Sequence, residues 1–235
     1  MNRPINRLLA ALPYKDYQRL CPHLELIELS QYEILYSVGK PYKYAYFPNQ
    51  SIIFSMAIME NGSPTDIGVI GNEGMLGLPI ILNTSDTKFT AIVQVSGYGY
   101  RIAAEHLQEE LSHQEALKNI LMCYVQTRII QLGQTAACNH HHSLEQRFAR
   151  WLLTVRDNIQ QDEFWLSYES ISQVLGVCYI TAAEIVEKIQ RTGIIDIHQG
   201  KVEILDHQAL EKATCECYQV IKKWSTISHK THLRS

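Results

Sequence analysis

The hydrophobic pattern of this chain changes from a strand-like to a helical period near residue 105, and this change divides the fold. From about Leu24 to Ile102, short runs rich in Ile, Val, Tyr and Phe alternate with Gly, Pro, Asn and Ser. This spacing is typical of a small barrel or jelly roll. The clearest turn is Asn61-Gly62, which predicts a type I′ hairpin between antiparallel strands. From His106 the apolar residues recur with helical spacing. We therefore predict an α+β chain in which an N-terminal β-barrel, preceded by short helices over residues 5–20, is followed by helices.

The helix expected after the barrel carries two apolar stripes. One is a heptad seam of two repeats, formed by Met122, Val125, Ile129, Leu132 and Ala136, and the other contains Leu117, Leu121 and Tyr124. A helix with two apolar stripes has two surfaces to cover, so one can pack on the barrel and the other on a second copy of the chain. A single broad core face is the alternative, because two heptads are fewer than a coiled coil requires.

A polar stretch, Asn139–Ser143, is expected to end this helix, and Ser143-x-x-Gln146 fits a capping box that starts the next one. The stretch contains His140, His141 and His142. Adjacent side chains on a turn diverge, and no acidic or cysteine partner lies at helical spacing, so we interpret the histidines as a polar hinge. Metal binding or pH sensing is the alternative.

Six cysteines are widely spaced, and only Cys215-x-Cys217 is a close pair. The pair has no partnering Cys or His at zinc spacing in the sequence, and wide spacing in a chain of this length does not indicate a disulfide framework. We therefore expect no metal and no cofactor.

Residues 167–191 predict a helix-turn-helix. Ser167 can cap a first short helix, Gly176 permits a left-handed turn, and a second helix begins near Tyr179. An ordinary helical hairpin is the alternative for this segment taken alone. Two β-branched runs, 194–197 and 201–205, follow with His198-Gln199-Gly200 between them, which predicts a hairpin. A helix pair followed by a hairpin is a winged helix, and its wing would present Lys201 to a phosphate backbone.

The order of barrel, long helix and winged helix-turn-helix resembles the Crp/Fnr family of bacterial transcription regulators. The resemblance covers almost the whole chain, and three stretches carry it: Gly71-Asn72-Glu73-Gly74-Met75-Leu76-Gly77, Ala137-Cys138-Asn139 through Trp151-Leu152-Leu153, and Leu175-Gly176-Val177 with the wing. Cys215-Glu216-Cys217-Tyr218 also resembles a recurrent segment of one branch of the family.

The resemblance implies three regions: a sensory β-barrel domain with N-terminal helices (1–105), a dimerisation helix (106–138) and a DNA-binding winged helix-turn-helix (139–235). It implies a homodimer joined through Met122, Val125, Ile129 and Leu132. The expected partners are double-stranded DNA, a second copy of the chain, RNA polymerase and a small-molecule effector of unknown identity.

The effector pocket departs from the cyclic-nucleotide members of the family. Those members carry an acidic residue for the ribose, matched here by Glu73, and an Arg for the cyclic phosphate, where Phe89 stands in this chain. A buried phosphate without its cation is costly, so cyclic AMP is not expected. We interpret Glu73 as a cap or turn residue. The iron–sulfur branch needs a cysteine cluster, whereas Cys21 stands by itself in the N-terminal region.

The second helix of the helix-turn-helix departs as well, because family members usually read bases with Arg near its start. Here Ile180 can touch a thymine methyl, Glu184 can accept from cytosine N4, and Tyr179 can bond a phosphate or stack. Phosphate contacts remain for Thr181, Lys188, Lys201 and Ser167. Either the DNA site differs from the usual one, or DNA binding is weakened.

The slightly acidic balance of the chain, 21 Lys and Arg against 24 Asp and Glu, favours weakened DNA binding. Bulk basicity therefore cannot carry DNA binding. Two functions remain open: a sequence-specific DNA-binding regulator, or a degenerate member that acts as a dimeric interaction module. An enzyme is not expected, because no nucleophile, P-loop, zinc-helix or paired-carboxylate motif is found. The absence of a long apolar run or secretion signal predicts a cytoplasmic protein without membrane contact.

Overall fold

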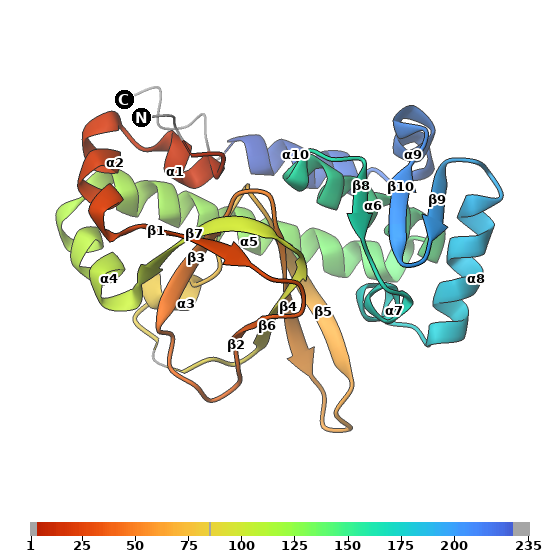
Figure 1. The fold of residues 1–235 in the computed structure, drawn as a ribbon, viewed down its shortest axis with the longest axis horizontal. Coiled ribbons are helices and arrows are strands. Elements are labelled where there is room, and N and C mark those ends of the chain that lie inside the picture. The colour runs from red at the N-terminus through yellow and green to blue at the C-terminus, as the bar shows by residue number, and fades with distance from the viewer. Residues whose placement is uncertain (1–3, 85, 228–235) are drawn as a thin grey trace.

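The computed structural model describes residues 4–84 and 86–227, and it has the α+β architecture expected from the sequence (Figure 1). The predicted ranges 1–105 and 139–235 also include residues 1–3, 85 and 228–235, which lie outside the described residues. Within the described part of the chain, no helix combines the length and the apolar character needed to cross a membrane.

The N-terminal part begins with two short helices and a 3-10 turn, and β-strands follow. In chain order the elements are α1 (Arg7–Ala11), α2 (Tyr14–Leu20), the 3-10 turn Cys21–His23, β1 (Glu25–Leu29), β2 (Ile34–Tyr36), β3 (Tyr44–Pro48), β4 (Ile52–Ile58), β5 (Pro64–Ile70), α3 (Leu78–Ile81), β6 (Thr90–Val95) and β7 (Gly97–Ala103).

These strands form two antiparallel sheets, with the orders β1-β7-β3 and β2-β6-β4-β5. Their inner faces share one core, to which Phe47 contributes from the first sheet and Ile53 and Val93 from the second. Two facing sheets around a common core are the arrangement of a jelly roll, as the alternating pattern predicted.

The β4–β5 hairpin forms around Asn61-Gly62, as predicted, but its turn is not of type I′. Ile58 pairs with Pro64, so residues 59–63 form a loop longer than two residues. Gly62 has a φ of 81°, whereas Asn61 is not among the described residues with positive φ. A type I′ turn needs positive φ at both central positions, so the type I′ prediction was wrong. The Asn61 Oδ1 accepts a hydrogen bond from the Ser63 N–H at 3.0 Å, which supports the longer loop.

The central helices are α4 (Ala104–His113) and α5 (Glu115–His141), and α5 lies along the sheets (Figure 1). Leu117, Leu121 and Tyr124 of α5 are buried in the N-terminal core. Met122, Ile129 and Leu132 are 44%, 65% and 43% exposed. The two stripes face different sides of α5, so the alternative of a single core face was wrong. The helix also continues beyond Asn139 to His141, later than predicted, and the His142 N–H still donates to the Cys138 carbonyl at 3.0 Å.

The glycines of the Gly71–Gly77 stretch allow this loop to approach the helices closely. A Cβ at Gly74 would lie 2.1 Å from the Tyr124 hydroxyl oxygen of α5, and a Cβ at Gly71 would lie 2.5 Å from the Asn158 Cγ. Asn158 belongs to α6 (Leu144–Ile159), so the loop contacts both the long helix and the helix after it. These distances give a steric reason for glycine at both positions.

The C-terminal part is a winged helix-turn-helix packed against the second sheet. After α6 come β8 (Glu163–Trp165), α7 (Tyr168–Leu175), α8 (Tyr179–Gln190), β9 (Ile195–His198), β10 (Lys201–Ile204), α9 (His207–Ala213) and α10 (Cys217–Ile227). The predicted capping box of Ser143 and Gln146 is present. The Trp151 ring of α6 meets the Phe54 ring of β4 edge-on, with centroids 5.7 Å apart, and both belong to one buried core. Helix α6 and the second sheet are therefore joined through apolar contacts.

Candidate nucleic-acid interface

The helix α8 is held by a buried face that leaves its opposite face free. Ser167 caps α7 by accepting from the Ser170 N–H at 3.2 Å, and Gly176 ends α7 with a φ of 67°. Both features were predicted from the sequence. Three apolar residues of α8, Ala182, Val186 and Ile189, then pack into the core. The Arg147 Nη2 donates to the Leu175 carbonyl at 2.6 Å and so ties the end of α7 to α6.

The free face of α8 carries the side chains predicted to read bases. Tyr179 is 51% exposed and Ile180 is 69% exposed at the start of the helix, and Glu184 is exposed one turn later. The Tyr179 ring lies beside the Tyr168 ring of α7, with centroids 5.7 Å apart. The structure therefore brings these residues onto the exposed surface of α8, where the Glu187 carboxylate is exposed as well.

The wing contains one strand that the sequence analysis missed. The strand β8 pairs with β10, and β10 pairs with β9, so the wing is a three-stranded sheet. The alternation of Phe164 and Leu166, which are buried, with Trp165, which is 51% exposed, is the signal that could have revealed β8. At the tip, Gln199 and Gly200 have φ values of 52° and 82°, as a two-residue type I′ turn requires.

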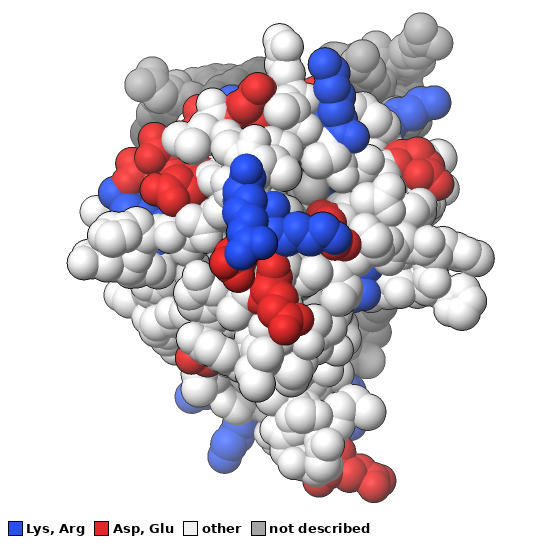
Figure 2. All heavy atoms as spheres, turned by 90° about the vertical axis from the view of Figure 1, so that its right-hand side faces the viewer, with Lys and Arg blue, Asp and Glu red and all other residues white. Residues whose placement is uncertain are grey.

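Three cations of α8 and the wing are each paired with a carboxylate. The Lys188 Nζ pairs with Glu145 of α6, and the Lys201 Nζ pairs with Glu163 of β8. The Nη2 of Arg191, the residue that follows α8, lies 2.6 Å from the Glu187 Oε1. Figure 2 shows this end of the molecule with basic and acidic groups side by side and most of the surface formed by other residues. Lys188 and Lys201, the predicted phosphate contacts, are therefore partly neutralised.

Cys178, which the sequence analysis did not single out for this surface, precedes α8 as its N-cap and is exposed. Its Sγ lies 3.3 Å from the Thr181 Oγ1. The hydrogen bond with the Thr181 hydroxyl lowers the pKa of the Cys178 thiol. Thr181, predicted to contact phosphate, thus also contacts this thiol.

The two residues predicted for an effector pocket lie in different surroundings. Glu73 is buried, its Oε2 accepts from the Gly71 N–H at 3.0 Å, and burial raises the pKa of its carboxyl against the opposing effect of the Arg128 guanidinium. Phe89 packs against the N-terminal core, where its ring centroid lies 6.4 Å from that of Tyr36. Glu73 borders a cavity of about 530 Å³, and Phe89 is not among the described residues that line it.

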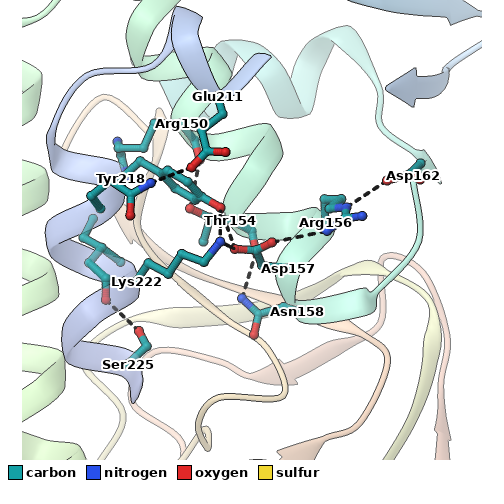
Figure 3. Close-up of polar contacts among 12 residues, drawn as sticks. Arg150, Thr154, Arg156, Asp157, Asn158, Asp162, Glu211, Tyr218, Lys222 and Ser225 are labelled. Carbon is teal, nitrogen blue, oxygen red and sulfur yellow. Dashed lines mark hydrogen bonds and ion pairs between the residues drawn. The ribbon is translucent and has the colours of Figure 1, made fainter. Parts of the chain in front are cut away.

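This cavity lies beside a polar network that joins α6 to α10 (Figure 3). The Tyr218 hydroxyl donates to the Asp157 Oδ2 at 2.7 Å, and the Lys222 Nζ lies 2.8 Å from the Tyr218 hydroxyl and 3.2 Å from the Asp157 Oδ2. Burial raises the pKa of Tyr218 to about 12, so its hydroxyl stays protonated at neutral pH. The network fixes α10 on α6 and leaves Arg7 and Arg156 on the cavity wall.

Residues 146–213 match the family model of the Crp-like helix-turn-helix domain. Among curated proteins, the chain is similar to the global nitrogen regulator of Synechococcus elongatus, with 18% identity over 199 residues, which cover 80% of this chain and 89% of that protein. Among solved structures, it is similar to FixK2 from Bradyrhizobium japonicum, with a TM-score of 0.65, 12% identity and coverage of 82% of this chain and 98% of that one. A CRP-family transcriptional regulator from Thermus thermophilus has a TM-score of 0.64 and 16% identity, with coverage of 80% and 95%. At these identities the solved structures establish the fold.

Proposed function

Because this chain is a Crp/Fnr-type regulator with a Crp-like helix-turn-helix domain, we propose that it is a homodimeric, sequence-specific DNA-binding transcription regulator. Helix α8 would enter the major groove, and the wing would follow the phosphate backbone. We propose that the protein recognises DNA without catalysing a reaction and that it acts in the cytoplasm. RNA polymerase is proposed as the partner through which the bound regulator would act.

The observation that carries this proposal is the free face of α8. A helix whose other side is fixed in a core can present a constant set of side chains to base edges. Ile180 is suited to a thymine methyl and Glu184 to cytosine N4, since these groups match the edges that each base shows in the major groove. Tyr179 can bond a phosphate or stack. This set favours a DNA site without the arginine-guanine contact.

Phosphate contacts are proposed for Lys188, Lys201, Thr181 and Ser167. Both lysines are at the surface, and Lys201 follows directly after the tip of the wing. The hydroxyl of Ser167 is already occupied as the cap of α7, so its contribution is expected to be small.

The dimer is proposed to form through the exposed stripe of α5. Met122, Ile129 and Leu132 are large apolar side chains that α5 leaves in solvent within one chain. Val125 lies between them on the same stripe and is half-buried. Association of two copies along this stripe would remove apolar surface from water and would place two α8 helices on one DNA duplex.

A second candidate function is a dimeric interaction module with little DNA affinity. The ion pairs of Lys188, Arg191 and Lys201 favour it, because each phosphate contact must compete with a carboxylate.

We also propose that cyclic AMP is not the effector of this protein. Phe89 packs near Tyr36 and supplies no cation for a cyclic phosphate.

Selection of bound fragments from random duplex DNA by the purified protein, followed by titration at several salt concentrations, tests the two functions. A regulator should enrich a two-fold symmetric sequence. Four cationic contacts per dimer would give a slope of log affinity against log salt of about −3 to −4. A protein that enriches no sequence and shows no salt-dependent binding would instead be the interaction module.

A further inference from the structure

Three cysteines and one histidine meet between the end of α5 and the turn that joins α9 to α10. Cys138, Cys215 and Cys217 are buried, His142 is partly buried, and the potential ligand atoms of all four residues lie within 4.8 Å of one another. In the sequence, no Cys or His lies at zinc spacing from the Cys215–Cys217 pair, so no metal was expected. The partners exist, but Cys138 is 77 positions away from Cys215 in the chain.

Two of the distances among these atoms equal those of a tetrahedral ion site. The Sγ atoms of Cys138 and Cys215 are 3.5 Å apart, and the Cys217 Sγ lies 3.7 Å from the His142 Nδ1. Zinc bonds of about 2.3 Å to sulfur and about 2.0 Å to nitrogen place tetrahedral ligands roughly 3.5–3.8 Å apart. The widest separation, 4.8 Å, would have to shorten by roughly 1 Å around a zinc ion of this geometry. One ion fits this space, whereas a cluster of several ions needs its ligands further apart.

The groups around the four residues orient them for a metal. The His142 Nε2 lies 3.1 Å from the Glu216 Oε2, so the carboxylate holds the ring while Nδ1 faces the sulfur atoms. A histidine ligand whose other nitrogen is held by a carboxylate is the usual arrangement in zinc sites. The Gln134 Nε2 also donates to the Cys217 Sγ at 3.0 Å, which suits a sulfur that carries negative charge.

The net charge of such a site would be balanced by cationic side chains nearby. Three thiolates and one divalent cation carry a net negative charge, and the guanidinium groups of Arg147 and Arg150 both interact electrostatically with Cys138. Arg150 is only 8% exposed. The Nε–H groups of both arginines are buried and donate to no hydrogen-bond acceptor among the residues that the structure describes. A nearby anionic centre would offset the cost of burying these cations.

We propose that Cys138, His142, Cys215 and Cys217 bind one zinc ion as a structural site. Soft thiolates with one imidazole in tetrahedral geometry favour zinc, and four protein ligands leave no open position for catalysis. Two ligands come from the end of the long helix and two from the segment after the wing. The ion therefore fastens the DNA-binding part to α5 and limits the orientations of α8 relative to the α5 stripe.

Zinc content of the full-length protein, purified with a thiol reductant and without chelator, is the primary test. We expect one zinc ion per chain, and its loss in the variants Cys215→Ser and His142→Ala. The variant His142→Cys keeps four ligands and should retain the metal. Cys21→Ser and Cys178→Ser are the matched controls, because they remove a cysteine outside the cluster and should retain zinc as well.

Cobalt substitution gives a readout that does not depend on variants that fold poorly. Co²⁺ bound to the wild-type protein should show the intense visible bands of a tetrahedral ion and thiolate-to-metal charge-transfer bands. His142→Cys should shift these bands, and Glu216→Gln should weaken zinc affinity roughly 10-fold because the ring of His142 loses its support.

The proposal is overturned if the reduced wild-type protein, supplied with zinc, holds well below one ion per chain. Iron or copper in place of zinc, or cobalt spectra of an octahedral ion, would also overturn it. A Cys138–Cys215 disulfide that persists in protein purified under reductant, detected by mass spectrometry, would show that the sulfur atoms pair with each other instead.

Discussion

The ammonium group of Lys201 pairs with the carboxylate of Glu163, across the two adjacent strands β10 and β8 of the wing. Lys201 is the cation of the wing nearest its tip, so the same carboxylate that positions it also opposes its contact with a phosphate. Both side chains are almost half exposed, and water therefore weakens the pair. In the proposed complex with DNA, the competition between this carboxylate and a phosphate would determine how strongly the wing binds the duplex.

Glu163→Gln should tighten binding to all DNA sequences alike, because it removes a negative charge from the wing and releases Lys201. The gain should shrink as salt rises, since it is electrostatic. Fluorescence anisotropy with specific and unrelated duplexes measures it. Glu109→Gln on α4 makes the same charge change far from the wing and should have little effect. Equal effects of the two substitutions would show that only net charge matters.

Glu184→Ala should separate base reading from repulsion. If Glu184 accepts from cytosine N4, the variant should lose preference at one base pair of each half-site by roughly 1–3 kcal/mol and bind unrelated DNA slightly better. Competition between the selected sequence and its single-base variants measures the preference. If the variant binds every DNA sequence more tightly by the same factor, Glu184 reads no base and only repels the phosphate backbone.

Val125→Glu combined with Ile129→Glu should give monomers, because two like charges would be buried on each side of the α5 stripe. Light scattering coupled to size-exclusion chromatography gives the mass directly. Leu26→Glu with Ile34→Glu is the matched control: these side chains are 60% and 58% exposed on the sheets and should leave the dimer intact. A dimer that survives the α5 substitutions has its interface elsewhere.

Asp66 should make stability fall as pH rises. Burial raises the pKa of its carboxyl to about 6, above the value of about 3.9 in an unfolded chain. Between these values the folded protein keeps a proton that the unfolded chain has lost, so the free energy of unfolding decreases through this window.

Asp66→Asn keeps an oxygen that can accept from the Gly68 N–H, which lies 3.0 Å from the Asp66 Oδ1. It should raise the free energy of unfolding by roughly 1–3 kcal/mol above about pH 7 and change it little near pH 4. Urea titrations at several pH values check this. If the stability of Asp66→Asn depends on pH in the same way as that of the wild type, the pH dependence arises from other groups. Asp86→Asn, at an exposed position, is the control.

Cyclic AMP should neither bind nor change DNA affinity. The position that would need a cation holds Phe89, which packs toward Tyr36. Calorimetric titration is the measurement, and a saturable site with a binding free energy beyond about −4 kcal/mol would contradict the expectation.

The sequence by itself determined the features that depend on neighbours along the chain. Ser143 with Gln146 and Ser167 form caps within four residues of the groups they bind, and Gly176 adopts the left-handed turn for which it was singled out. The two stripes of α5 follow from helical periodicity. The prediction of a type I′ turn at Asn61-Gly62 was wrong, although it concerned residues that are adjacent in the chain. The sequence pattern shows that a turn exists but not how many residues it contains.

Only the tertiary structure decided which distant side chains meet. Hydrophobic periodicity predicts whether a side chain is buried or exposed, but it does not predict which residues of other elements the side chain contacts. Cys138 and Cys215, the ion pair of Lys188 with Glu145, and the packing of Trp151 on Phe54 all join segments far apart in the chain. The lysines identified as phosphate contacts were exposed as expected, yet their carboxylate partners came from other elements. Charge pairing and ligand sets depend on distances of a few ångströms between such segments, and these distances arise only when the helices and sheets pack together.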